Sequence, residues 1–435
     1  MKKIIKSAAA VILVVAGALS AAAEDDDLFG DTVIDGTTQT DVSSAGNGST
    51  TAEQTDSAHG TIFRNGTVKV GGQFDMSLTS LTRFNESTSA EESVRQTVLS
   101  PLADALFTID ARPSDNLRLY FKSGIHYPYL TETNAVVGTT GNSQKSTQNL
   151  FYVRELFTDF AIRDTAYFRF GKQTITWGTG CFFSPAGNTV NLSAIDPEDT
   201  TKQVEGPLAL RTQIVFKGSQ NCIWAYMIPD TSFLPSSITG SSTYTMASNT
   251  AFAVKGDIVS GGWELGPGAY YKYGHAPKAL LTVSGTLFNK INTFGECVYA
   301  YGTDADWSTN VQWDNKDSIW QATAGGSYTW KEPQITFAGQ YYYDGNDDDT
   351  WDTSTHGHNI AALVSFAKVF TTDITASVYG NINFGADLCT TSAMLYYSPV
   401  NELKLGAGPY IVWSSLDKSP DTAVKLSAEL SGGKF

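Results

Sequence analysis

Short runs in which apolar and polar residues alternate constrain this chain more than any other feature of its sequence. In residues 117–122, three apolar residues alternate with Arg118, Tyr120 and Lys122. A period of two residues is typical of a β-strand with one apolar and one polar face. No long segment repeats its apolar residues every 3.6 positions, and no stretch beyond Glu24 approaches the ~20 apolar residues of a transmembrane helix. The sequence therefore predicts an all-β protein.

Eighteen such runs follow one another: 66–84, 102–112, 116–130, 148–163, 166–178, 207–218, 221–228, 250–259, 262–274, 278–288, 291–302, 319–330, 334–343, 358–369, 373–385, 388–397, 402–414 and 423–435. Tight turns follow the even-numbered runs, and long loops follow most odd-numbered runs. Outer-membrane barrels alternate in this way, with short periplasmic turns and long extracellular loops. A propeller would show a repeat of about 40–50 residues, which the chain lacks. We expect a transmembrane antiparallel up-and-down β-barrel of about 18 strands over residues 66–435, with 16 as the alternative count.

The composition agrees with a barrel whose outer face meets lipid. Only 17% of the 435 residues are charged, against about 25% in soluble domains, and 12% are aromatic. Aromatic residues cluster near the ends of runs, as in Tyr341-Tyr342-Tyr343 and Tyr396-Tyr397, where they suit the lipid headgroup level. The net charge of −15 argues against nucleic acid as a partner, because binding to phosphates needs a basic face. A soluble β protein with core aromatics remains the alternative.

Two segments precede the first run. Residues 1–23 have a basic start, an apolar run and the small residues Ala21-Ala22-Ala23, which together predict a cleaved secretory signal peptide. Residues 24–65 carry nine acids and few large apolar residues, and this composition predicts a flexible acidic tail. At the other end, Phe435 is the kind of terminal aromatic that the barrel assembly machinery reads, so this machinery is an expected partner together with outer-membrane lipid.

One local motif is sharper than the strand pattern. Gly171-Lys172-Gln173 is followed by Trp177-Gly178 and, further on, by Asp196-Pro197-Glu198-Asp199. Residues 171–211 resemble alginate-export-type and related uncharacterised porin-like outer-membrane barrels, in which a strand reading G-[KR]-Q-x-x-x-W-G runs into a loop with an N/D-P-x-D step. The resemblance implies a barrel channel but does not imply alginate. Gly178 and Gly180 would let the strand bend at its top, and the connection 179–206 is long enough to fold into the lumen.

Charged residues concentrate around this motif and define the candidate site. The candidates for the lumen wall are Arg118, Lys122, Arg154, Glu155, Asp159, Lys172, Arg211 and Lys217, and those in a constriction loop are Trp177, Asp196, Glu198, Asp199 and Glu205. Opposed charges across a lumen orient water and select solutes. Simple solvated lining and a structural capping loop are the alternatives. Arg169 and Lys172 fall on opposite faces of an ideal strand, so one of them must lie near an interface unless a bulge intervenes.

Other chemistry has little support. Cys181, Cys222, Cys297 and Cys389 are widely spaced, and three of them fall in strand-like runs, which favours small apolar roles over disulfides. The acidic segment 344–349 lacks the glycine and glutamate of a calcium loop, so we expect no metal and no cofactor. No hydrolase or metalloprotease motif is present, and His126 and His275 have no recognisable nucleophile beside them. We do not expect an enzyme.

These observations predict an outer-membrane channel for the passive diffusion of small hydrophilic solutes, weakly cation-preferring, in a Gram-negative-type envelope. The tail 24–65 is too polar for the plug that a FadL-like transporter of apolar compounds would need. A surface adhesin would act through the polar loops 131–147, 229–249 and 303–318, and it remains the other alternative.

Overall fold

The computed structural model describes residues 63–65, 67–84, 89–127, 130–133, 144–147, 150–163, 165–198, 200, 203–229, 247–331, 333–345, 357–369, 373–414 and 420–432. The predicted signal peptide, nearly all of the acidic tail, Asp199 and Phe435 lie outside these residues, and so does most of the acidic loop after Asp344.

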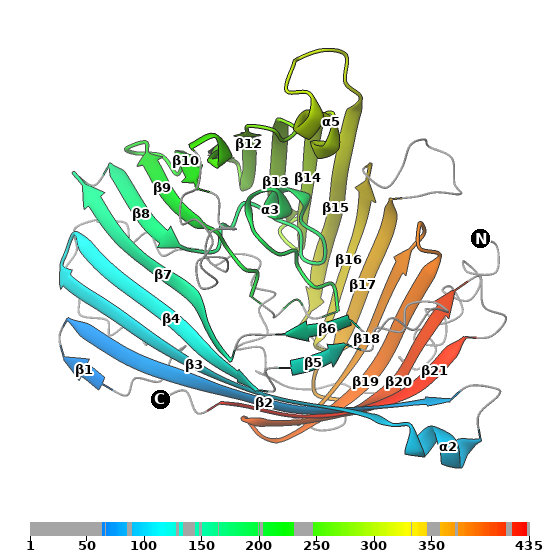
Figure 1. Cartoon of the computed structure of the whole chain (residues 1–435). Helices are drawn as coiled ribbons and strands as arrows, with labels where there is room; N and C mark the ends of the chain where they lie inside the picture. The colour runs from blue at the N-terminus through cyan, green and yellow to red at the C-terminus, as the bar shows by residue number, and fades with distance from the viewer. Residues whose placement is uncertain are drawn as a thin grey trace.

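Eighteen antiparallel strands form a closed barrel (Figure 1). They are β2 (Val68–Phe84), β3 (Val98–Ser114), β4 (Leu117–Tyr127), β7 (Phe151–Ile162), β8 (Ala166–Lys172), β9 (Leu208–Val215), β10 (Cys222–Ile228), β11 (Ala251–Ser260), β12 (Trp263–Lys272), β13 (Lys278–Leu287), β14 (Ile291–Tyr301), β15 (Ser318–Trp330), β16 (Ile335–Asp344), β17 (His358–Phe366), β18 (Ile374–Asn383), β19 (Leu388–Val400), β20 (Leu403–Ser414) and β21 (Asp421–Gly432). Each pairs with the next along the chain, and β2 pairs with β21 to close the barrel.

The predicted strand number and topology are confirmed, since each predicted run corresponds to one strand. The largest difference concerns the predicted run 166–178, because β8 ends at Lys172. Residues 173–178 leave the sheet and enter the barrel, where their alternating side chains pack against other inward-facing groups. The run 102–112 is also too short, since β3 begins at Val98.

The two faces of the barrel differ as the alternation predicts. Large apolar side chains on the outer face are exposed on strands all round the barrel, among them Phe74, Leu119, Phe160, Phe252, Leu265, Phe337, Leu395 and Leu426. The inner face carries most of the charged side chains. A bulge in the pairing of β4 with β7, between Lys122 and Ser123, turns two consecutive residues of β7, Arg154 and Glu155, toward the inside.

The elements outside the barrel wall are short. Strand β1 (Phe63–Asn65) pairs with β2, and β5 (Leu130–Thr133) pairs with β6 (Gln144–Thr147). The helices are α2 (Ala90–Arg95), α3 (Pro185–Val190), α5 (Asp304–Thr309) and the 3₁₀ turn η2 (Ala247–Asn249). Among the described residues, no helix has both the length and the apolar character required to cross a bilayer.

Candidate functional site

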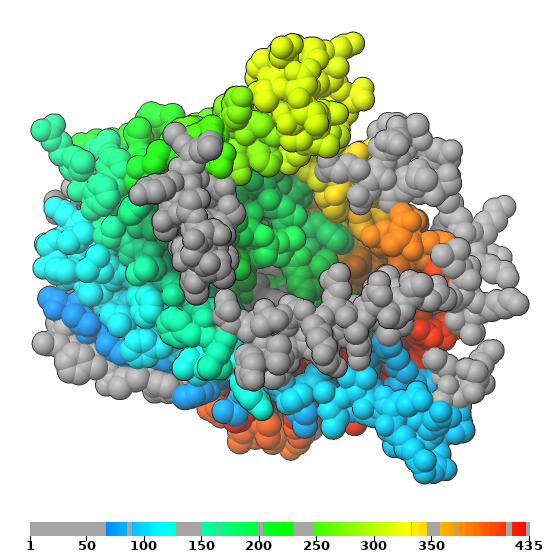
Figure 2. Space-filling model, viewed as in Figure 1, coloured from blue at the N-terminus to red at the C-terminus, as the bar shows by residue number. Residues whose placement is uncertain are grey.

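The connection between β8 and β9, residues 173–207, folds into the barrel, and we call it the inner loop. Both strands are short, so the loop leaves the wall partway up the barrel. Its helix α3 begins at Pro185 and is capped by Ser184, whose Oγ accepts a hydrogen bond from Gly187 N at 3.1 Å. α3 contacts β13, β14 and β15 on the other side of the lumen. Figures 1 and 2 show the loop in the hollow of the barrel.

Glu296 on β14 anchors the near part of the inner loop. Its residue is 4% exposed. Its carboxylate accepts hydrogen bonds from Thr179 N at 2.6 Å, Gly180 N at 2.7 Å and Ala186 N at 2.9 Å, and from Ser184 Oγ at 3.1 Å. Charge-assisted bonds of this kind are about twice as strong as neutral ones. One inward-facing carboxylate therefore holds both the start of α3 and the segment before it.

Gln340 on β16 provides a second anchor. Its Oε1 accepts hydrogen bonds from the backbone N–H groups of Cys181, Phe182 and Phe183, and its Nε2 donates to Phe183 O at 2.5 Å. Nε2 also donates to Thr323 Oγ1 at 2.6 Å, which ties the anchor to the barrel wall. The turn 181–183 thus has its polar backbone paired while its two phenylalanine rings pack against Tyr379 and Tyr342.

Two glycines make this path possible. Gly171 has a φ of +139°, and a Cβ there would lie 2.1 Å from Leu156 O. This conformation interrupts the regular alternation at the end of β8, and Lys172 then reaches inward although its position in an ideal strand would point it outward. Gly178 is required for close packing, because a Cβ would lie 1.7 Å from Ser184 Oγ. The sequence predicted that Gly178 lets the strand bend at its top. In the structure, Gly178 instead lets two parts of the inner loop pack closely against each other.

The end of the inner loop contacts the wall that the sequence predicted to be basic. Lys172 Nζ lies 2.6 Å from Glu205 Oε1, and Lys122 Nζ donates to Gln203 Oε1 at 2.9 Å. Trp177 does not project into the lumen. It is 2% exposed and packs edge-on against Tyr226, with ring centroids 5.4 Å apart.

Four charged side chains form one cross-strand row on that wall: Arg118, Asp159, Arg169 and Arg211, on β4, β7, β8 and β9. Arg169 makes two hydrogen bonds to Asp159, at 2.6 and 2.9 Å, and Arg118 makes two to Asp110, at 2.9 and 3.1 Å. Arg211 has no carboxylate within ion-pair distance among the described residues, and its guanidinium lies over the Trp224 ring at 5.2 Å. Strand carboxylates thus neutralise much of this wall, and the loop carboxylate of Glu205 pairs with Lys172 at its edge.

The acidic tip of the inner loop lies against a different wall. Glu198 Oε1 accepts a hydrogen bond from Tyr410 Oη of β20 at 3.3 Å, and Glu198 N donates to Asp196 Oδ1 at 3.0 Å. Burial inside the barrel raises the pKa of Glu198, and the nearby Asp196 adds to this effect, while the Tyr410 bond opposes it. Lys425 on the neighbouring strand β21 of the same wall also interacts electrostatically with Glu198.

The remaining predicted residues have separate places. Arg154 lies over the Tyr152 ring at 5.3 Å, and Glu155 stands opposite Lys122 in the strand register. Lys217 is exposed in the turn between β9 and β10, so it is not on the lumen wall. All four cysteines are free. The described part of the chain holds no cluster of three metal-ligating side chains.

Sequence reasoning missed the two anchors, Glu296 and Gln340, and the wall opposite the acidic tip. The sequence did contain a signal for Glu296, because it is the one acidic residue in the predicted strand run 291–302. The partners of the tip, Tyr410, Lys425 and Tyr379, come from strands about 180 to 230 residues further along the chain, and no local pattern links them to it.

No family model and no curated protein matches this sequence. Among solved structures, the barrel is similar to Pseudomonas aeruginosa OccK9 (OpdG), with 7% identity and a TM-score of 0.49 over 84% of this chain and 98% of that one. It is also similar to Acinetobacter baumannii OccAB4, with 9% identity and a TM-score of 0.46 over 83% and 98% of the two chains. Salmonella typhi OmpF in complex with daunomycin gives 9% identity and a TM-score of 0.46 over 86% and 100%.

Proposed function

We propose that this protein is an outer-membrane channel for the passive diffusion of small hydrophilic solutes, with the inner loop as its constriction. The observation that carries the proposal is a closed barrel that is apolar outside and charged inside, with a loop anchored across its interior by Glu296 and Gln340. Exposed apolar side chains on so many strands of the outer face are unfavourable in water and suited to lipid. The resemblance of residues 171–211 to alginate-export-type barrels fits a channel and names no solute.

The height of the outer face supports insertion into an outer membrane. Trp320 and Trp330 lie at opposite ends of β15 and are both exposed. The ten residue steps between them span about 33 Å along the strand at ~3.3 Å per residue. A tilt of about 40° reduces this span to roughly 25 Å, the height of the apolar band between the aromatic girdles of outer-membrane barrels.

The charge distribution favours a weak preference for cations. Residues 66–435 carry 35 acids and 25 bases, a balance of −10. The arginine row is largely compensated by Asp110 and Asp159, and Asp196 and Glu198 place carboxylates inside the lumen. Carboxylates along a pore raise the local concentration of cations.

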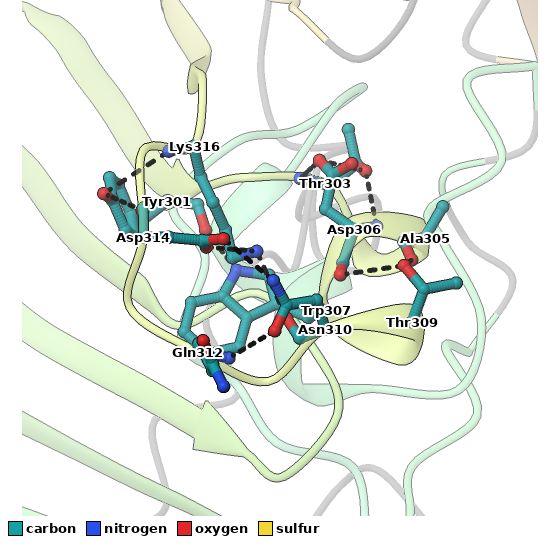
Figure 3. A network of polar contacts seen from close by, with 10 residues as sticks. All are labelled: Tyr301, Thr303, Ala305, Asp306, Trp307, Thr309, Asn310, Gln312, Asp314 and Lys316. Carbon is teal, nitrogen blue, oxygen red and sulfur yellow. Dashed lines mark hydrogen bonds and ion pairs between the residues drawn. The ribbon is translucent and has the colours of Figure 1, made fainter.

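A surface adhesin is the second candidate, and one observation favours it. Residues 302–317, which include α5, project above the barrel rim (Figure 1), and Figure 3 shows their hydrogen bonds around the fully buried Trp307. Trp313 beside it is 67% exposed and stacks on Tyr301. An ordered projection with an exposed tryptophan could bind a partner in addition to the channel function.

Single-channel recording in planar bilayers tests the main proposal. Protein refolded in detergent should give a strand-dominated circular dichroism spectrum, heat-modifiable gel mobility and discrete conductance steps. A folded barrel without conductance would contradict the channel function, and a helical spectrum or solubility without detergent would contradict the membrane barrel.

A further inference from the structure

The projection at 302–317 contains an aromatic ring that its own packing leaves exposed. Trp313 is 67% exposed, whereas Trp307 beside it is fully buried. Trp313 stacks on Tyr301 with ring centroids 6.0 Å apart, and Trp307 stands nearly perpendicular to it with centroids 4.9 Å apart. Tyr301 and Trp307 are themselves only 6.4 Å apart, so they cannot lie on opposite faces of Trp313. One face of this indole is therefore free, and we call it the stacking platform.

Hydrogen bonds on both sides of Trp313 fix the backbone that carries it (Figure 3). Asn310 Oδ1 accepts a hydrogen bond from Gln312 N at 3.1 Å, and Asn310 Nδ2 donates to Asp314 Oδ2 at 2.8 Å. Tyr301, on which Trp313 stacks, donates from its hydroxyl to Asp314 O at 2.6 Å. A ring that is held in place before binding loses little conformational entropy when a partner docks on it. The stacking platform is thus preformed.

Polar side chains border the stacking platform. Gln312, Asp314, Asn315 and Asp317 are all exposed. Within the described part of the chain, no hydrogen bond or ion pair engages the side-chain polar groups of Gln312, Asn315 or Asp317. A protein partner would need a much larger surface, about 800 Å² on each side. One aromatic ring with unengaged amides and a carboxylate beside it favours a small amphipathic partner.

The position of the projection argues against lipid as this partner. Figures 1 and 2 show the segment with α5 rising above the rim of the barrel. In the proposed orientation, Trp320 near the start of β15 lies at the lipid headgroup level. Trp313 precedes β15 and belongs to the projection, so it lies beyond this aromatic girdle.

The charge of the projection restricts the partner further. Residues 302–317 contain four acids and one base, a balance of −3. The one base, Lys316, lies 3.2 Å from Asp314 and so adds little positive charge outside the projection. A negative field of this kind repels anionic ligands. The partner is therefore expected to be neutral.

We propose that Trp313 is the stacking platform of a binding site for neutral hexose units of a glycan. This inference rests on the second candidate function, the adhesin, and names its partner class; it does not depend on the channel. The C–H face of a hexose ring is apolar and packs on an indole, while the hydroxyls at its rim need donors and acceptors. The amides of Gln312 and Asn315 supply both, and the carboxylate of Asp317 accepts hydrogen bonds from hydroxyls.

Titration of the full-length protein, refolded in detergent, with cellohexaose tests the proposal by calorimetry. This neutral glucose oligomer should bind, and a tetramer of sialic acid should not, because its carboxylates are repelled. Trp313→Ala should weaken cellohexaose binding at least about tenfold, since it removes the stacking surface, and Trp313→Phe should retain part of it. Gln312→Ala and Asp317→Asn should each weaken binding by about two- to fivefold, the range for one hydrogen bond.

A matched control separates the site from a general effect of exposed aromatic rings. Phe288 is 82% exposed in the turn between β13 and β14, at the other end of these strands, and Phe288→Ala should leave cellohexaose binding unchanged. Limited proteolysis at the native rate shows that Trp313→Ala keeps the projection folded. If this variant is cut faster, Trp313→Phe and Gln312→Ala decide instead.

Three results would overturn the site: no binding of cellohexaose, equal binding of the sialic acid tetramer, or binding that the Trp313 and Gln312 variants leave unchanged. Single-channel conductance measured on the same preparations distinguishes this failure from that of the channel. Conductance without glycan binding contradicts the site alone, and glycan binding without conductance contradicts the channel alone.

Discussion

At the scale of single residues, the charges of the lumen differ in how far they are compensated. Arg118 and Arg169 each bind a carboxylate through two hydrogen bonds, so each pair presents little net charge to a passing ion. Arg211 shares their row and lies near Arg169 and Asp159, but among the described residues no carboxylate lies within 4.0 Å of its guanidinium, which contacts Trp224 and Tyr226. Equal formal charges on one wall therefore do not carry equal weight for selectivity.

This difference leads to a prediction for Arg211. Arg211→Gln should strengthen cation preference, because it removes a positive charge that has no contact ion pair among the described residues, at a place where screening by salt is weaker than at the surface. Lys217→Gln is the matched control, since it removes the same charge from an exposed turn of the same strand pair. Reversal potentials in a KCl gradient should shift toward the cation value for the first variant and stay in place for the second. Equal shifts would mean that Arg211 does not face the pathway.

At the scale of elements, the inner loop depends on two side chains from distant strands. Glu296 accepts three backbone N–H groups and one hydroxyl from the loop. Glu296→Ala leaves these donors buried and unpaired, which costs about 1–3 kcal/mol for each. Glu296→Gln keeps one acceptor and should have a smaller effect. We expect single-channel conductance and current noise to rise from the native protein to the glutamine variant and further to the alanine variant.

A matched control separates this effect from a general loss of charge. Glu429→Ala removes a carboxylate from β21 that pairs with Lys404 at 3.6 Å and has no bond to the described residues of the inner loop. Its conductance should resemble that of the native protein. If Glu296→Ala conducts like Glu429→Ala, then other contacts, such as those of Gln340, hold the loop by themselves.

The projection at 302–317 is a second element with its own interior. Thr303 and Asp306 form a capping box at the start of α5, and Trp307 is 0% exposed between Ala276 and Ala300. Hydrogen bonds from Thr303 hold the pKa of Asp306 below its ordinary value, so this cap persists into mildly acidic solution. Trp307→Ala should cost about 3–5 kcal/mol of local stability. Limited proteolysis should then cut within 302–317 while heat-modifiable mobility of the barrel is unchanged, and cutting at the native rate would contradict this role for Trp307.

At the scale of the whole molecule, the alternation of residues in the sequence predicts the barrel because each strand repeats the same local rule. The alternation of apolar and polar residues predicts the number of strands. It also predicts that Arg118 and Lys122 face inward and that Leu119 faces outward. Parity fails between Gly171 and Gly178, where a positive φ and a close approach redirect the chain inward. It also cannot pair Glu198 with Tyr410, or Gly180 with Glu296, because those contacts depend on which strands lie opposite once the barrel has closed.

The last prediction concerns ion selectivity as a property of the whole channel. A balance of −10 over residues 66–435 and the lumen carboxylates should make the reversal potential in a KCl gradient cation-selective. This preference should fade toward 1 M salt, where the Debye length falls to about 3 Å and distant loop charges no longer act. Lowering the pH should also weaken the cation preference. Because burial raises the pKa of Glu198, this carboxylate loses its charge at a higher pH than an ordinary glutamate does, so the first decrease should precede the titration of the other carboxylates. Glu198→Gln should remove that early step and leave the later, ordinary titration of the remaining carboxylates. Clear anion selectivity at low salt would show instead that Lys425 and Arg211 dominate the pathway.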